Sequence, residues 1–198
     1  MEITISKTRE KLIEVARQLF ARNGVENTTM NDISQASEKG RRTLYTYFKS
    51  KTEIYHAVVQ SELSMLLVSL ENVVKKNLSA DQKLLEFIDT RLKAIKDVVL
   101  RNGTLRADFF RDIWRVETVR RNFDRQEIKF IEKILSDGIK EGVFEIKDTY
   151  ATAEVLHYAF KGLEVPYIRG TISDLINGNE RKTKSVINLM FHGILKNN

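Results

Sequence analysis

Apolar residues recur at spacings of three and four along most of the chain, which is the period of helices that bury one face. In the N-terminal part this pattern predicts helices over about 6–23, 29–37 and 41–48. Asn23-Gly24 ends the first, because glycine accepts the left-handed backbone at a helix C-terminus. Gly40 lies in the turn before the third. The pattern therefore predicts three short helices around a small core.

Longer helices are predicted in the rest of the chain. The fourth begins at a capping box in which the Ser50 hydroxyl accepts from the Glu53 amide and Glu53 reaches back to the Ser50 amide. Ser79 and Gln82 offer a second capping box, and Asp148 a further cap. Pro166 is expected to kink or end the helix that contains it. The later helices are predicted over about 51–76, 80–101, 123–141, 149–168 and 181–196, and 104–122 is helical with undefined breaks.

Composition agrees with an all-α protein. Hydrophobic residues make up 42% of the 198 residues, and there is one proline. There are no cysteines, which excludes disulfides and cysteine-ligated metals. The polar N-terminus is unlike a signal peptide, and no run approaches the roughly 20 apolar residues that cross a bilayer. We therefore expect a cytoplasmic protein that does not enter membranes.

Charge becomes informative through its position. The net charge is +6, and the segment from Lys39 to Lys51 has five basic residues and no acidic one. A helix fits the major groove of DNA when one face is anchored and the other presents hydrogen-bond donors. Leu44 and Phe48, four residues apart, supply the anchors. On the other face Arg42 can fork onto guanine, and helix N-termini in this region favour phosphates.

The same residues carry a resemblance. The motifs Thr28-Thr29-Met30-x-x-Ile33 and Thr43-Leu44-Tyr45-x-Tyr47-Phe48-x-Ser50-Lys51-x-Glu53 resemble the N-terminal domain of TetR-family transcriptional regulators. The resemblance covers about residues 6–60. It implies a helix-turn-helix DNA-binding domain over 1–53, extending to about 66, and a helical ligand-binding and dimerisation domain over 54–198. A homodimeric repressor that binds a palindromic operator and is released by a small molecule is the function it implies.

The DNA contacts follow from the motif positions. Thr29 and Lys51 match phosphate contacts, and Tyr47 matches a tyrosine that meets the DNA backbone. The full predicted set is Thr28, Thr29, Lys39, Arg41, Arg42, Thr43, Tyr45, Thr46, Tyr47 and Lys51.

The turn departs from the family pattern. Ser37-Glu38-Lys39-Gly40 stands where family members have Ala-Gly-Val-Ser, so a glycine replaces the serine cap. Lys39 either reaches a phosphate or points into solvent.

The C-terminal part carries no catalytic signature, so we expect neither an enzyme nor a cofactor. Its aromatic residues either pack the core or line an apolar effector pocket between helices. Those residues are Phe87, Phe109, Phe110, Trp114, Phe123 and Tyr158. Three histidines, His56, His157 and His192, lack partners at metal-ligand spacing, and we expect no metal.

The helices predicted over about 149–168 and 181–196 are expected to form a homodimer interface. The dimer would hold its two DNA-binding domains about 34–36 Å apart, the spacing of two half-sites on one face of DNA. The residues expected there are Leu156, Leu163, Val186, Met190 and Ile194. The alternative function is an all-helical protein-interaction module that does not bind DNA.

Overall fold

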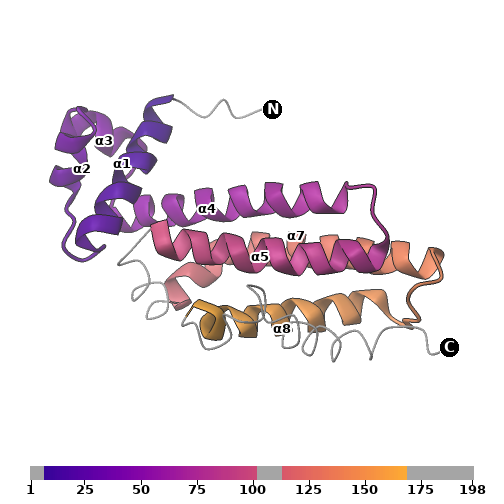
Figure 1. The fold of residues 1–198 in the computed structure, drawn as a ribbon. Coiled ribbons are helices and arrows are strands. Elements are labelled where there is room, and N and C mark those ends of the chain that lie inside the picture. The colour runs from indigo at the N-terminus through magenta and orange to yellow at the C-terminus, as the bar shows by residue number, and fades with distance from the viewer. Residues whose placement is uncertain (1–6, 102–112, 169–198) are drawn as a thin grey trace. The chain divides into compact units, whose positions relative to one another are not determined.

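The computed structural model describes residues 7–101 and 113–168, which are helical apart from their connections and hold no strand (Figure 1). The all-α prediction is confirmed. The helices are α1 Lys7–Asn23, α2 Met30–Ala36, α3 Arg41–Tyr47, α4 Lys51–Val74, α5 Ala80–Arg101, α7 Ile113–Lys140 and α8 Thr149–Ile168. The helix predicted over 181–196 lies outside the described residues.

The chain divides into two compact units. The first, called the head unit, comprises Met1–Ser64 and Val98–Arg121, and the second, called the body unit, comprises Met65–Asp97 and Asn122–Asn198. Helices α4, α5 and α7 each contribute residues to both units. The two units are described separately below.

The head unit closes around residues that the helical spacing predicts to be buried. Leu12, Ala16 and Phe20 lie at intervals of four on α1 and are fully buried. They share one core with Ile33 of α2 and Leu44 of α3. After α1, Gly24 has φ 83° and its amide donates to the Phe20 carbonyl at 3.0 Å, as expected of a left-handed helix end.

Helix α4 begins at the predicted cap, with one correction. The Glu53 amide donates to the Ser50 hydroxyl at 3.2 Å, but the Glu53 carboxylate accepts from the Lys49 amide at 2.6 Å rather than from the Ser50 amide. The Glu53 side chain therefore caps the amide one residue before the predicted one.

Helix α4 is also long and apolar enough to cross a membrane by length and composition alone. Its first half contributes Ile54 and Val58 to the head core, which is the arrangement of a buried helix in a globular domain.

In the body unit, buried apolar residues line α5, α7 and α8. Examples are Leu84 and Phe87 on α5, Ile131 and Leu135 on α7, and Phe160 on α8.

One helix boundary differs from the prediction and one matches it. α7 begins at Ile113 rather than near Phe123, because the two segments form one continuous helix. α8 runs from Thr149 to Ile168, which is the predicted range, and Pro166 lies inside it two residues before its end.

Candidate nucleic-acid interface

The start of α2 is held by a reciprocal cap between Thr29 and Asp32. The Thr29 hydroxyl accepts from the Asp32 amide at 3.2 Å, and the Asp32 carboxylate accepts from the Thr29 amide at 2.8 Å. This amide hydrogen bond, with a second from the Thr29 hydroxyl, lowers the pKa of Asp32 below its ordinary value. The cap fixes where α2 begins and places Thr29 at the head surface.

Thr28 has a different role from the one predicted. Its side chain is fully buried, and its hydroxyl donates to the Gly24 carbonyl at 2.8 Å. A contact between this side chain and DNA therefore does not hold. Thr28 instead ties the loop after α1 to the start of α2. The sequence motif did not show which of Thr28 and Thr29 is buried.

The unusual turn between α2 and α3 is built from side-chain bonds and one left-handed residue. Glu38 has φ 56°, the conformation that the family pattern assigns to a glycine at this place. The Ser34 hydroxyl donates to the Lys39 carbonyl at 2.7 Å, and the Ser37 hydroxyl donates to the Ser34 carbonyl at 3.0 Å. Across the turn, Lys11 of α1 pairs with Glu38 at 3.3 Å. These bonds close the turn without a glycine at position 38.

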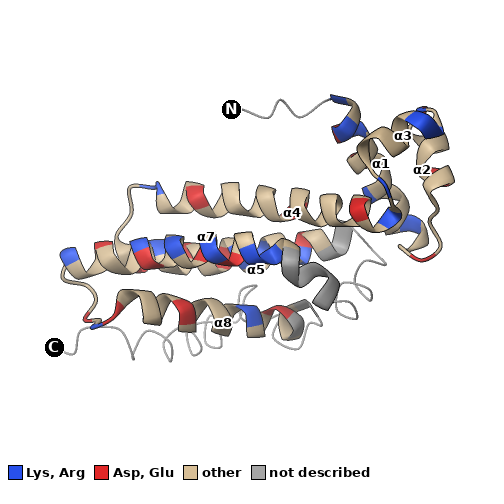
Figure 2. Ribbon diagram, turned by 180° about the vertical axis from the view of Figure 1, so that it is seen from behind, with Lys and Arg blue, Asp and Glu red and all other residues tan. Residues whose placement is uncertain are grey.

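Helix α3 presents the face that the sequence predicts. Leu44 and Phe48 are buried at 0% and 1% exposure and anchor the helix in the head core. The exposed predicted contacts are Arg41, Arg42, Tyr45 and Thr46, while Lys39, Thr43 and Tyr47 are half-buried. Figure 2 shows basic residues at the start of α3. The Thr46 hydroxyl is already used, since it donates to the Arg42 carbonyl at 2.9 Å.

Lys51 links the start of α4 to the loop after α1. Its ammonium donates to the Val25 carbonyl at 2.7 Å and to the Glu26 carbonyl at 3.0 Å. An ammonium has three donors, so one remains for a phosphate. Lys51 therefore links α4 to the loop after α1, and its third donor remains available for the predicted phosphate contact.

The predicted pocket residues are placed less uniformly. Phe87 and Phe123 are buried in the body unit, whereas Tyr158 is 62% exposed and does not join them. Phe109 and Phe110 lie outside the described residues. Trp114 belongs to α7, but its side chain also lies outside what the structure describes.

The predicted dimer residues need a similar correction. Leu156 is buried within its own chain and Leu163 is half-buried, so Leu156 is not available to a partner. The large exposed hydrophobic residues of α8 are instead Tyr150 at 51%, Val155 at 68% and Tyr158 at 62%. One residue is a rotation of about 100° around a helix, which accounts for the change of face. Val186, Met190 and Ile194 lie outside the described residues.

A buried polar cluster in the body unit was missed. It joins Arg91 of α5, Asp124 and Glu127 of α7, and His157 and Glu164 of α8. The partners are 30 to 73 residues apart in sequence. No local spacing signal connects such residues, which is why the sequence showed only scattered charges.

Comparisons with known proteins agree with the geometry of the head. Residues 12–58 match the family model for the bacterial regulatory proteins of the tetR family. The "Uncharacterized HTH-type transcriptional regulator YfiR" of Bacillus subtilis (strain 168) is 26% identical over 149 residues, which cover 74% of this chain and 72% of the relative.

Two further comparisons concern a repressor and a solved structure. The "Probable acrEF/envCD operon repressor" of Escherichia coli (strain K12) is 36% identical over 74 residues, 37% of this chain and 31% of the relative. The structure of the SmeT–triclosan complex has a TM-score of 0.70 at 17% identity, covering 97% of this chain and 93% of that one. The structural likeness extends the shared fold beyond the head.

Proposed function

The chain is a TetR-family transcriptional regulator, and from that premise we propose that it is a homodimeric repressor that binds a palindromic DNA operator and releases it when a small molecule binds the body unit. The head unit would read DNA, and the body unit would hold the effector and the partner chain. A cytoplasmic location is part of this proposal.

One observation carries the DNA-binding half of the proposal. Leu44 is buried while Arg41, Arg42 and Tyr45 are exposed on the same seven-residue helix. A major groove accepts a helix anchored in this way, with side chains directed at base edges. We assign the reading of a guanine to Arg42, since its guanidinium can donate to both O6 and N7. Lys51 contributes a phosphate contact through its remaining donor.

Selection of bound sequences from random DNA tests this assignment. A palindromic consensus is expected, with affinity that falls linearly in log–log terms as salt rises, because bound phosphates release counterions. Arg42→Ala should then cost roughly 1–3 kcal/mol at one base position of each half-site and relax the preference there. Lys129→Ala is the matched control: it removes one exposed positive charge from α7 in the body unit and should leave the base preference unchanged.

Two outcomes would refute the proposal. If Arg42→Ala kept both affinity and base preference, the reading face would lie elsewhere. If the full chain selected no DNA sequence and bound a protein partner independently of salt, the alternative of a helical interaction module would replace it.

The homodimer half rests on the surface of α8. Its exposed positions include Ala151, Val155, Tyr158, Ala159 and Gly162, which recur at helical spacing and carry no charge. A Cβ added at Gly162 would meet no atom of the described residues within 4 Å, apart from the neighbouring backbone of α8 itself. Large exposed apolar residues arranged in one stripe mark association surfaces. Val155→Glu should yield a monomer in analytical ultracentrifugation, and an unchanged dimer would move the interface away from α8.

The effector half is supported by the neighbours. A repressor is among the relatives, and triclosan occupies the SmeT complex whose fold this chain shares. A ligand changes DNA affinity only through different affinities for two states of the protein. We propose α4 as the connecting element, because the same continuous helix starts beside Lys51 and ends in residues of the body unit.

A further inference from the structure

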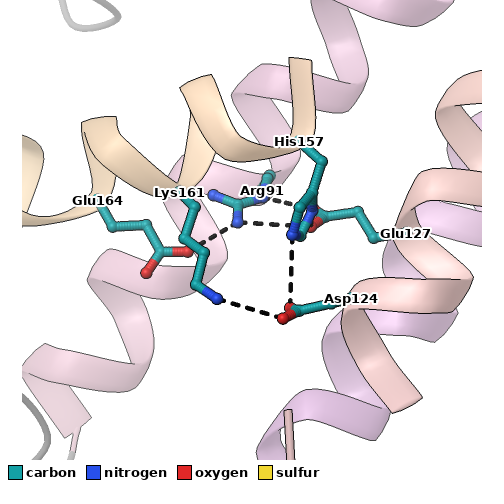
Figure 3. Close-up of polar contacts among 6 residues, drawn as sticks. All are labelled: Arg91, Asp124, Glu127, His157, Lys161 and Glu164. Carbon is teal, nitrogen blue, oxygen red and sulfur yellow. Dashed lines mark hydrogen bonds and ion pairs between the residues drawn. The ribbon is translucent and has the colours of Figure 1, made fainter. Parts of the chain in front are cut away.

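The buried cluster between α5, α7 and α8 contains three side chains with metal-ligand chemistry. Asp124 and Glu127 lie three residues apart on α7 and therefore share a face, and His157 faces them from α8 (Figure 3). One ligand atom from each of the three lies within 4.8 Å of the others. All three belong to the body unit.

The two nitrogens of His157 have different surroundings. Nδ1 lies 2.6 Å from a Glu127 carboxylate oxygen, and both side chains are fully buried. Arg91 donates to the same carboxylate through Nε, so Glu127 is an acceptor and Nδ1 carries the donated proton. In the neutral imidazole, Nε2 is then the nitrogen that offers a lone pair. A carboxylate on the far nitrogen is the usual arrangement around a metal-binding histidine.

Nε2 is directed at a second carboxylate. It lies 3.7 Å from Oδ1 of Asp124 and has no hydrogen-bond partner within the described structure, although it is buried. This separation exceeds a hydrogen bond of about 2.7–3.2 Å. It is within the roughly 4 Å that two metal–ligand bonds of about 2.0–2.2 Å span end to end. A buried lone pair facing a carboxylate at this distance fits a cation held between them.

Charged groups surround this position. Arg91 and Lys161 pair with the carboxylates of Glu127, Glu164 and Asp124, and the buried Arg120 lies one helical turn before Asp124 on α7. Lys161 holds the other oxygen of Asp124 at 3.2 Å and so orients Oδ1 toward His157.

We propose that His157 and Asp124, with Glu127 beside them, form a binding site for a divalent transition-metal ion of the zinc class. His157 supplies Nε2 and Asp124 supplies Oδ1. Glu127 fixes the imidazole tautomer through Nδ1. A nitrogen donor together with oxygens suits zinc and its neighbours better than magnesium or calcium, which take oxygen ligands. This proposal does not rest on DNA binding by the head.

Calorimetric titration of the full chain with zinc chloride tests the proposal. We expect one saturable site per chain, with magnesium chloride giving no comparable binding. Asp124→Asn and His157→Gln should each weaken zinc binding by at least about tenfold, the effect that loss of an outer-shell partner alone can have. Asp137→Asn, the same chemical change elsewhere on α7, and His56→Gln, a histidine of the head unit, are the matched controls and should bind zinc as the wild type does.

A visible absorption spectrum of the wild-type protein with cobalt(II) tests the site without depending on variants that could fail to fold. Cobalt(II) in a low-coordinate site with nitrogen and oxygen ligands absorbs far more strongly in the visible range than the hydrated ion. Appearance of such a band at one equivalent supports the site. The proposal is overturned if the wild type binds no zinc and leaves cobalt hydrated, or if folded Asp124→Asn and His157→Gln bind zinc unchanged. Equal loss in the two control variants also overturns it.

Discussion

Replacing Gly40 by serine should stabilise the recognition helix. Gly40 is the N-cap of α3 and provides no side-chain hydrogen bond, whereas Thr29 caps α2. Its backbone, at φ −59° and ψ 149°, is open to any L-residue, and an added Cβ would meet no atom of the described part of the chain within 4 Å. A serine hydroxyl at this position can accept from one of the free amides of the first turn of α3.

The expected gain has two sources. A serine cap is better than glycine by a few tenths of a kcal/mol. Loss of glycine's freedom in the unfolded chain adds about 0.4–1 kcal/mol when the native conformation suits the new residue. The sum is about 1 kcal/mol. Gly40→Ala shares the second source but forfeits the cap, which costs about 1 kcal/mol relative to serine. The expected order of stability is therefore serine first, with alanine close to glycine.

Native-state hydrogen exchange of the α3 amides measures the difference where it arises, and urea unfolding measures its effect on the whole chain. A gain of about 1 kcal/mol corresponds to roughly fivefold slower exchange through opening. If alanine protected α3 as well as serine, the hydroxyl would not cap the helix. If both variants were less stable than the wild type, the space and backbone angles at Gly40 would differ from those seen here.

Three further predictions concern the turn, the cap of α2 and the packing of α7. Glu38→Gly should stabilise the head by about 1 kcal/mol in urea unfolding, because it relieves the left-handed φ of 56°, while Glu38→Ala should not. Thr29 lowers the pKa of Asp32, so this carboxylate stabilises the fold above its unfolded pKa of about 3.9. Because this stabilisation is lost as pH falls through the lower folded pKa, Asp32→Asn should flatten the acid side of the profile of unfolding free energy against pH. Gly138→Ala should lower the thermal midpoint, since its Cβ would overlap the Phe144 ring at a cost of about 1–3 kcal/mol.

The head was predictable because its interactions are local. The four-residue spacing of Leu44 and Phe48 indicated which face of α3 is buried, and Asn23-Gly24 indicated the end of α1. Two features escaped. The burial of Thr28 beside the exposed Thr29 depends on the tertiary core. The left-handed backbone at Glu38 belongs to a residue type that rarely adopts it, so no residue preference signals it.

The body was less predictable because its interactions join residues that are far apart in sequence. Helix α8 is apolar on several sides, so the sequence did not show that Leu156 faces inward and Val155 outward. The buried ion pairs join residues far apart in sequence, such as Arg91 and Glu164. Their pairing follows from the helix packing and leaves no periodic trace in the sequence.

The buried charges of the body have a consequence for how the protein can change. A buried ion pair adds little stability compared with apolar packing, but loss of one partner leaves a charge uncompensated at a cost of several kcal/mol. Arg91 is fully buried and holds Glu127 of α7 and Glu164 of α8 together, so it penalises arrangements of these helices that break either contact. A cation between His157 and Asp124 would add a further link between α7 and α8 to the pairs His157–Glu127 and Lys161–Asp124. Cation binding at this place would therefore further restrict how α7 and α8 move relative to one another, which Arg91 already restricts. Helix α7 also supplies residues to the head unit.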